Sequence, residues 1–176
     1  AAVESAFRRV PRHKLVERFY VYDDSRGGYM EIVRDPSDPE PEKLALIYSN
    51  RVLVTRLGPN GMPSSSTSEP ALMAQMLELL RLEQGHKVLE IGAGTGYNAA
   101  LIAEIVGAQS NVVTVDIQED VVEQARRLLH AAGYGNVKLV HGDGFFGLAD
   151  EAPFDRVVAT VGLFDVSPHW TSQLAT

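Results

Sequence analysis

Hydrophobic and polar residues follow two kinds of pattern along this chain, and the change falls near residue 68. Downstream of it, short apolar runs typical of buried strands alternate with stretches in which apolar residues recur at helical spacing. We predict strands at 88–91, 111–116, 137–141 and 155–160, and helices from Pro70, from Tyr97 to Gly107, and from 119 to 132 before Gly133. This alternation predicts an α/β fold: a doubly wound, mostly parallel, Rossmann-like sheet with right-handed crossovers and helices on both faces.

Upstream of residue 68 the apolar positions are less regular. Residues 3–19 fit an amphipathic helix interrupted at Pro11, and we interpret its basic cluster as a solvated face: Arg8, Arg9, Arg12, His13 and Lys14. Two β-rich runs around residues 25–28 predict a hairpin. Two polar stretches are expected to be exposed loops, the acidic, proline-rich segment 35–43 and the flexible, serine-rich segment 58–68.

The two patterns divide the chain into an N-terminal helical and hairpin cap, residues 1–66, and a core, residues 67–176, which we expect to pack as one unit. The core shows only four strands, and its last segment, SPHWTSQLAT, resembles the start of a helix that leads to another strand. An open sheet cut at this point would expose a buried type of strand at its edge. We therefore expect the core to be truncated at its C-terminal end, with more chain after Thr176.

The stretch VLEIGAGTGYNAA, residues 88–100, is typical of a nucleotide-type site. Gly92, Gly94 and Gly96 follow an apolar strand and precede a helix, so the backbone can approach a ligand and the helix start offers unpaired N–H groups. A dinucleotide fingerprint needs its third glycine where Tyr97 stands here, which disfavours NAD. By itself, the turn also fits a glycine cluster kept only for close packing.

Glu90 adds a charge near the end of a strand that otherwise reads as fully buried, where an acid is costly without a partner. A cationic ligand would supply that partner. S-adenosylmethionine (SAM) carries a sulfonium and an ammonium and no pyrophosphate. An acid followed by G-x-G-x-G therefore suits SAM better than NAD.

Two further acids end the next two predicted strands. Asp116 follows the glycines by about 20 residues, the spacing at which a carboxylate accepts both hydroxyls of a ribose. Asp143 lies between Gly142 and Gly144, where it could accept from an adenine amine. Each could instead be a helix N-cap or turn residue. The conjunction of three acids at the carboxyl ends of successive strands favours a ligand site.

The amino-acid composition argues against several other classes of function. Sixteen basic and 23 acidic residues give a net charge of −7, which argues against a large nucleic-acid footprint. The absence of cysteine excludes thiolate chemistry, and the five histidines show no ligand spacing, so no metal is expected. No apolar run reaches 18 residues. We expect a soluble, cytoplasmic protein that binds neither nucleic acid nor membrane.

Several segments together resemble the protein-L-isoaspartate (D-aspartate) O-methyltransferases. They are VPRHKLV, then Tyr48 with Asn50 and Leu53, then SSTSEPALMAQMLELLRLEQGHKVLEIGAGTGYNAALIAEIVG, and GYGNVKLVHGDGFFGLADEAPFDRVVATVG. The resemblance covers roughly residues 7–17 and 44–170, and the combination is specific. It implies a SAM-dependent methyltransferase core, with the substrate side in residues 1–66.

The resemblance also implies residue roles. SAM would be held by Glu90, Ile91, Gly92, Ala93, Gly94, Thr95, Gly96, Asp116, Ile117, Gly142, Asp143 and Gly144. Ser68 matches the serine that lies beside the acceptor carboxylate, and we place Thr67 with it. The implied reaction is transfer of a methyl group from SAM to a carboxylate of an isoaspartyl or aspartyl residue in a protein or peptide, which begins repair through a succinimide.

The chain departs from the family at three places, all where the family meets its peptide. About 25 residues intervene around 20–42, Glu69 replaces a small or amide residue, and VGLFDVSP stands where Ala-Ala-Ala-Pro is expected. A carboxyl methyltransferase dedicated to one peptide in natural-product maturation is therefore an alternative. A small-molecule methyltransferase with His141 as base, and a SAM-binding module without catalysis, are others.

Methyl transfer to a carboxylate demands placement above all, with no metal and no nucleophilic side chain. Residues 58–70 contain no lysine or arginine that would hold back the charge of the acceptor. They offer hydroxyls, so Ser68 and Thr67 could orient the carboxylate weakly. Ser68 could equally be a plain N-cap of the helix that follows.

Overall fold

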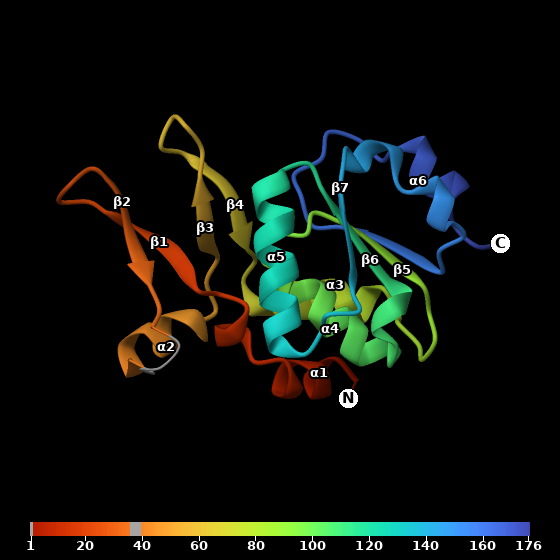
Figure 1. The fold of residues 1–176 in the computed structure, drawn as a ribbon, viewed down its shortest axis with the longest axis horizontal. Coiled ribbons are helices and arrows are strands. Elements are labelled where there is room, and N and C mark those ends of the chain that lie inside the picture. The colour runs from red at the N-terminus through yellow and green to blue at the C-terminus, as the bar shows by residue number, and fades with distance from the viewer. Residues whose placement is uncertain (1, 36–39) are drawn as a thin grey trace.

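The computed structural model describes residues 2–35 and 40–176, and it contains two four-stranded sheets that lie side by side (Figure 1). The first sheet is antiparallel, in the order β2-β1-β3-β4, with β1 Arg18–Asp23, β2 Gly28–Val33, β3 Leu53–Leu57 and β4 Pro63–Thr67. The second is parallel, in the order β7-β6-β5-β8, with β5 Val88–Ile91, β6 Val112–Asp116, β7 Lys138–His141 and β8 Arg156–Ala159.

The parallel sheet confirms the predicted α/β core. Its four strands are in register, with Ile91 opposite both Val115 and Ala159, and Asp116 opposite His141. Consequently all four carboxyl ends meet at one edge, where open α/β sheets bind their ligands. The connecting helices are α3 Pro70–Leu79, α4 Tyr97–Val106 and α5 Glu119–Ala132, and short 3₁₀ turns are η2 Gln109–Asn111, η3 Gly144–Phe146 and η4 Ala149–Glu151.

The helices cover the two faces of this sheet unequally. Residues from α3, α4 and α5 pack on the face of Val88 and Val112, together with α1 Ala2–Arg9. Phe154 and Trp170, the latter on the short helix α6 Pro168–Ser172, pack on the opposite face. We predicted helices on both faces. In the described part of the chain, the second face is covered by one short helix, α6, in place of long crossover helices. The β7–β8 connection contains three glycines and a proline, which favour turns over a long crossover helix.

The N-terminal half differs more from its prediction. The first helix ends at Arg9, a 3₁₀ turn η1 covers Arg12–Lys14, and Phe19 lies in β1 rather than in a helix. Arg12, assigned to a solvated face, is buried. Pro11 ends the helical pattern, so the basic residues after it follow a different geometry from those before it. The predicted hairpin is confirmed, because β1 and β2 pair from Arg18↔Val33 to Asp23↔Gly28.

The serine-rich segment is a strand and not a flexible loop. Its turn is confined to 58–62, closed by hydrogen bonds from Gly58 N to Met62 O and from Gly61 N to Gly58 O. Strand β4 then pairs with β3, for example Val54↔Ser66. All five of its residues line a cavity, so it does not need the apolar alternation by which a buried strand is recognised.

The acidic loop predicted at 35–43 lies partly outside the described residues, at 36–39. At its end, helix α2 occupies Pro41–Ile47, with proline in the first turn, where it needs no hydrogen-bond donor. Among the helices of the described ranges, none is long and apolar enough to cross a membrane.

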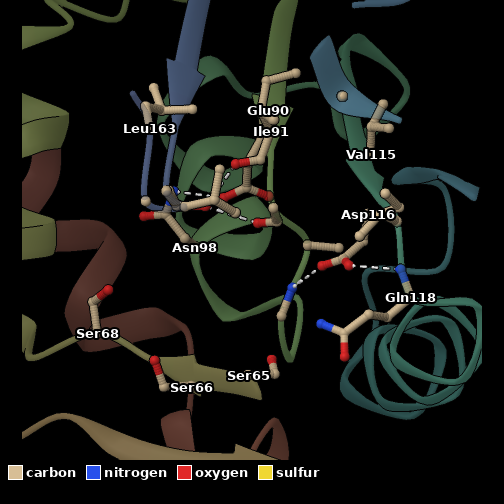
Figure 2. A pocket seen from close by; sticks show the side chains of 18 of the residues that line it. Ser65, Ser66, Ser68, Glu90, Ile91, Asn98, Val115, Asp116, Gln118 and Leu163 are labelled. Carbon is tan, nitrogen blue, oxygen red and sulfur yellow. Dashed lines mark hydrogen bonds between the residues drawn. The ribbon is translucent and has the colours of Figure 1, made fainter. Parts of the chain in front are cut away.

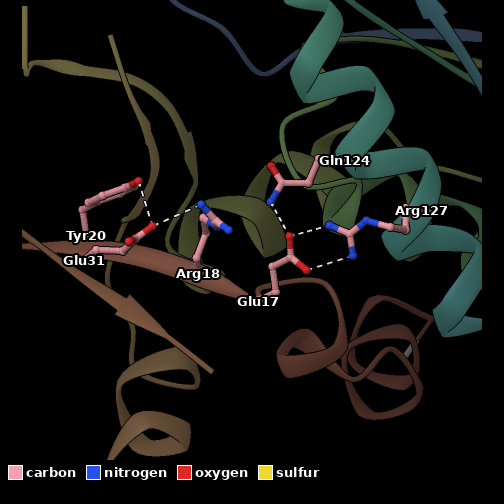
Figure 3. A network of polar contacts seen from close by, with 6 residues as sticks. All are labelled: Glu17, Arg18, Tyr20, Glu31, Gln124 and Arg127. Carbon is pink, nitrogen blue, oxygen red and sulfur yellow. Dashed lines mark hydrogen bonds and ion pairs between the residues drawn. The ribbon is translucent and has the colours of Figure 1, made fainter. Parts of the chain in front are cut away.

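Side chains join the two sheets across helix α5. Glu17, just before β1, accepts hydrogen bonds from Arg127 and Gln124 of α5 (Figure 3). Arg56 of β3 forms an ion pair with Asp120, in the first turn of the same helix, over 2.6 Å. The antiparallel sheet is thereby fixed beside the carboxyl edge of the parallel sheet.

Candidate active site

A cavity of about 700 Å³ opens at the carboxyl edge of the parallel sheet, between β5, β6 and strand β4. Figure 2 shows Ser65, Ser66 and Ser68 on one side of it, facing the wall that carries Glu90, Asn98 and Asp116. The predicted site residues that line it are Thr67, Ser68, Glu90, Ile91, Gly92, Ala93, Gly94, Thr95, Asp116, Ile117, Asp143 and Gly144. Gly96 and Gly142 are the two predicted residues that do not line it.

The glycine turn after β5 is built on left-handed backbone geometry. Gly92 has φ of 101°, and a Cβ there would come within 2.5 Å of Val161 Cγ1. Gly96 has φ of 83° and caps helix α4, and a Cβ there would meet Leu129 at 2.7 Å. Gly92 therefore lets the segment after β8 approach the turn, whereas Gly96 lets α4 pack against α5. This explains why Gly96 faces the core and not the cavity.

Glu90 is fully buried at the base of the cavity, on the helix-covered face of β5. Its Oε1 accepts a hydrogen bond from Asn98 Nδ2 over 2.7 Å, and its Oε2 has no partner within the described residues. Burial raises the pKa of Glu90 to about 7, and the neighbouring side chains of Asn98 and Thr114 oppose that rise. An unpartnered acid in this position suits a ligand that brings a cation or a donor.

Asp116 ends β6 on the adjacent wall and shapes the glycine turn directly. One carboxylate oxygen accepts from Gly94 N over 3.2 Å and the other from Gln118 N over 3.0 Å. Both bonds come from backbone amides, so the carboxylate is held in place before any ligand arrives. Each oxygen keeps a further lone pair for a hydroxyl donor.

Asp143 lies at the rim of the cavity. It is a capping residue, which was the alternative to a ligand contact in the sequence analysis. Its Oδ1 accepts from Phe145 N over 2.9 Å, which caps the 3₁₀ turn η3. The side chain is exposed and lines the cavity. The capping bond uses Oδ1 and leaves Oδ2 outside that bond.

Ser68 is not the N-cap of α3. That position belongs to Glu69, whose side chain makes no capping bond, and Asn50 Oδ1 accepts from Ala71 N over 2.9 Å instead. A cap supplied from another segment leaves the Ser68 hydroxyl free of that role. Thr67, at the end of β4, is buried and lines the cavity beside it.

Asn98, Gln118 and Thr160 are among the polar lining residues that the sequence analysis missed. Asn98 supports Glu90, Gln118 Nε2 donates to Ser64 O over 3.0 Å, and Thr160 Oγ1 donates to the carbonyls of Ile91 and Gly92. A polar residue in the first turn of a mostly apolar helix was the signal for Asn98. The other two follow acidic or apolar strand ends, and their sequence context is not distinctive.

His141, the alternative base, lies outside the cavity lining. Its Nε2 is 3.2 Å from the carbonyl oxygen of Ile117, and its side chain is exposed. Among the described cavity-lining residues there is no lysine, arginine or histidine. In the same described part of the chain, no cluster of three acids and histidines could hold a metal ion.

A parallel sheet of this order, with a glycine turn after β5 and an acid at the end of β6, defines a Rossmann-like fold of the methyltransferase class. The chain belongs to the protein-L-isoaspartate(D-aspartate) O-methyltransferase family, whose sequence profile matches residues 1–176.

Relatives and solved structures agree with this assignment. A protein-L-isoaspartate O-methyltransferase of Thermotoga maritima is 36% identical over 160 residues, which are 91% of this chain and 50% of that protein. One from Methanothermobacter thermautotrophicus is 40% identical over 154 residues, covering 87% of this chain and 68% of that protein. The chain thus spans about half the length of the T. maritima relative.

A solved protein-L-isoaspartate O-methyltransferase shares 32% identity and superposes with a TM-score of 0.77, over 99% of this chain and 47% of that one. A structure described as a putative protein-L-isoaspartate O-methyltransferase from Plasmodium falciparum, in complex with S-adenosyl-L-homocysteine, has a TM-score of 0.72. It covers 99% of this chain and 72% of that one. At 16% identity, that second likeness shows the fold alone.

Proposed function

We propose that this protein transfers a methyl group from SAM to a carboxylate of an isoaspartyl or aspartyl residue in a protein or peptide. The observation that carries the proposal is the meeting of two walls in one cavity. One wall holds the buried acid Glu90 and the fixed acid Asp116, and the other holds the hydroxyl-bearing strand β4. Family membership supports the same reaction.

The residues present fit SAM on grounds of their own chemistry. The unpartnered Oε2 of Glu90 suits a cationic group, and the two held oxygens of Asp116 suit the pair of ribose hydroxyls. Asp143 would accept from the adenine amine at the rim. The glycine turn and its neighbours would complete the site: Ile91, Gly92, Ala93, Gly94, Thr95, Ile117 and Gly144. In this proposal Gly96 and Gly142 support the site without touching the ligand.

The chain's own task in this reaction is placement. SAM, when bound, supplies an electrophilic methyl group, so the acceptor oxygen needs no activation by a metal. A carboxylic acid is already ionised near neutral pH, and the absence of basic side chains from the described lining leaves its charge free to react. Ser68, with Thr67 behind it, would orient the acceptor by hydrogen bonds.

We further propose a division of labour between residues 1–66, on the acceptor side, and residues 67–176, on the cofactor side, packed as one unit. Contacts across the division support it, such as Gln118 to Ser64 and Asp120 to Arg56. The boundary cuts strand β4 one residue before its end, so neither part has a complete acceptor wall.

Paired peptides test the proposal. The purified full-length protein is incubated with SAM and two peptides that differ only in carrying aspartate or isoaspartate, and products are weighed by mass spectrometry. We expect a gain of one methyl group on the isoaspartyl peptide. Methylation of the aspartyl peptide alone would favour the dedicated peptide methyltransferase. Tight SAM binding without methylation of either peptide would refute the proposed activity and favour a binding module.

A further inference from the structure

Arg12 is a buried cation whose hydrogen-bond partners in the described part of the chain are all backbone carbonyl oxygens. Its side chain belongs to η1 and is only 1% exposed. Nη1 donates to the carbonyls of Ile47 and Ser49 over 2.9 and 3.2 Å. Nη2 donates to those of Arg51 and Ser68 over 3.4 and 2.9 Å. One guanidinium therefore joins the N-terminal segment, the loop after α2 and the residue proposed to orient the acceptor.

We propose that Arg12 is a positioning residue for methyl transfer, which holds Ser68 at the acceptor side of the cavity. This inference rests on the proposed function. Arg12 is absent from the cavity lining, so it would act through the Ser68 backbone and not on the acceptor itself.

Ser68 needs such a support because regular structure ends on both sides of it. The β3–β4 ladder stops at Leu53↔Thr67, and helix α3 begins at Pro70. The bond from Arg12 Nη2 is therefore what fixes the carbonyl between these two elements.

The same guanidinium also secures the helix that follows. Asn50, which caps α3 through Ala71 N, lies in the loop between the two carbonyls of Ser49 and Arg51 that Arg12 holds. Arg12 thus holds Ser68 directly, through the Ser68 carbonyl. It also holds Ser68 indirectly, because Asn50 fixes the start of α3 just after it.

The shape of the side chain suits this task better than that of lysine. A planar guanidinium directs its four Nη hydrogens in fixed directions, and here each has a carbonyl acceptor, while Nε has no acceptor among the described residues. A lysine ammonium offers three hydrogens from a single point and cannot span three segments. Arg12→Lys should keep a charge in the site while releasing part of this grip.

A control comes from another arginine contact between the N-terminal segment and the core. Arg127 of α5 binds Glu17 over 2.5 Å, and this pair joins the same two parts of the chain without touching Ser68 (Figure 3). Arg127→Lys therefore loosens the junction alone. Because Arg127 is more exposed than Arg12, the comparison rests on the pattern of effects: a purely structural role for Arg12 predicts that peptide turnover and SAM affinity fall together in a folded Arg12→Lys variant.

The test compares wild type, Arg12→Lys and Arg127→Lys by SAM affinity, steady-state methylation of the isoaspartyl peptide and amide hydrogen exchange over residues 66–73. For Arg12→Lys we expect kcat/KM for the peptide to fall by about tenfold or more, since small misplacement is costly in transfer reactions. SAM affinity should stay within about threefold, because the fixed acids Glu90 and Asp116 are not partners of Arg12. Exchange should rise at 66–73 in this variant only.

Several results would overturn the inference. Equal peptide turnover in Arg12→Lys and wild type would do so, as would a parallel loss of SAM affinity or exchange that rises equally in both variants. A wild type that methylates no isoaspartyl peptide defeats the proposed function separately, and hydrogen exchange then still decides whether Arg12 fixes Ser68. Should Arg12→Lys fail to fold, Asn50→Ala at an exposed position must lower peptide turnover with SAM affinity retained, and unchanged turnover would refute the idea.

Discussion

Asn98 Nδ2 donates a hydrogen bond to Glu90 Oε1 over 2.7 Å, and this is the side-chain support of a carboxyl that is otherwise shut off from water. The two residues come from opposite sides of the glycine turn, β5 and the first turn of α4. Asn98 bonds only Oε1, and Oε2 of Glu90 has no hydrogen-bond partner among the described residues. A ligand can supply the missing donor or cation.

The first prediction concerns stability against pH without ligand. Burial raises the pKa of Glu90 to about 7 from 4.5, so between these values the folded chain keeps a proton that the unfolded chain has lost. Stability should therefore fall as pH rises through this window, by up to roughly 3 kcal/mol relative to Glu90→Gln, which stays neutral. Urea unfolding of both proteins at several pH values gives the difference.

Glu17→Gln serves as the control of opposite sign. The hydrogen bond from Arg127 lowers the pKa of Glu17, so its contribution is present above the unfolded pKa and is lost as pH falls through the folded one. The wild-type advantage over Glu17→Gln should thus grow with pH. A wild-type stability that tracks Glu90→Gln at every pH would contradict the assignment of a neutral, buried Glu90.

The second prediction concerns SAM affinity. A cationic group contacting Glu90 favours its ionised form, so binding should release a proton below about pH 7 and tighten as pH rises from 6 to 8. Asn98→Ala removes a bond that lowers the pKa of Glu90, and it should weaken binding most at the acidic end. Calorimetry in two buffers of different ionisation enthalpy counts the proton. Binding that is equally strong in Glu90→Gln and independent of pH would show that no cation meets this acid.

The α/β half was predictable because its signals are local. Helix α5 was expected at 119–132 and occupies Glu119–Ala132, since Gly133, with φ of 91°, stops it as a glycine in the left-handed region does. The strands are short apolar runs between glycine and polar turns. Their parallel arrangement followed from the rule that alternating units build a parallel sheet, whereas the strand order and register come from the structure.

The acceptor side could not be read from sequence for a physical reason. Strand β4 is polar because part of it faces a cavity, and Arg12 is buried because four carbonyls from distant segments surround it. Neither environment produces a periodic pattern of hydrophobic residues in the sequence. The capping of α3 by Asn50, 21 residues away, likewise displaced the local candidate Ser68.

The third prediction separates backbone strain from packing in the glycine turn. Gly96→Ala adds a methyl group 2.7 Å from Leu129 at a position with φ of 83°, whereas Gly133→Ala adds one with open space around it at φ of 91°. Gly133→Ala should cost about 1–2 kcal/mol of stability from the left-handed backbone alone. Gly96→Ala should lose the same backbone contribution and, in addition, roughly 1–3 kcal/mol of stability because the new methyl group overpacks against Leu129. Thermal or urea unfolding measures both, and equal losses would mean that α4 and α5 adjust without cost.

The last prediction distinguishes a carboxylate acceptor from an alcohol, phenol or amine. A carboxylic acid with a pKa of about 4 is ionised throughout the neutral range, so its methylation needs no base. At saturating SAM, where the titration of Glu90 no longer limits binding, the single-turnover rate should be nearly flat between about pH 6 and 8.

Ser68→Ala should lower that rate through looser placement while SAM affinity stays close to wild type. His141→Ala should leave the rate largely intact, because its ring contacts the Ile117 carbonyl and lies outside the cavity lining. Rapid-quench rates across this range make the measurement. A steep rise with pH that disappears in His141→Ala would mean that the acceptor must lose a proton, and hence that it is not a carboxylate.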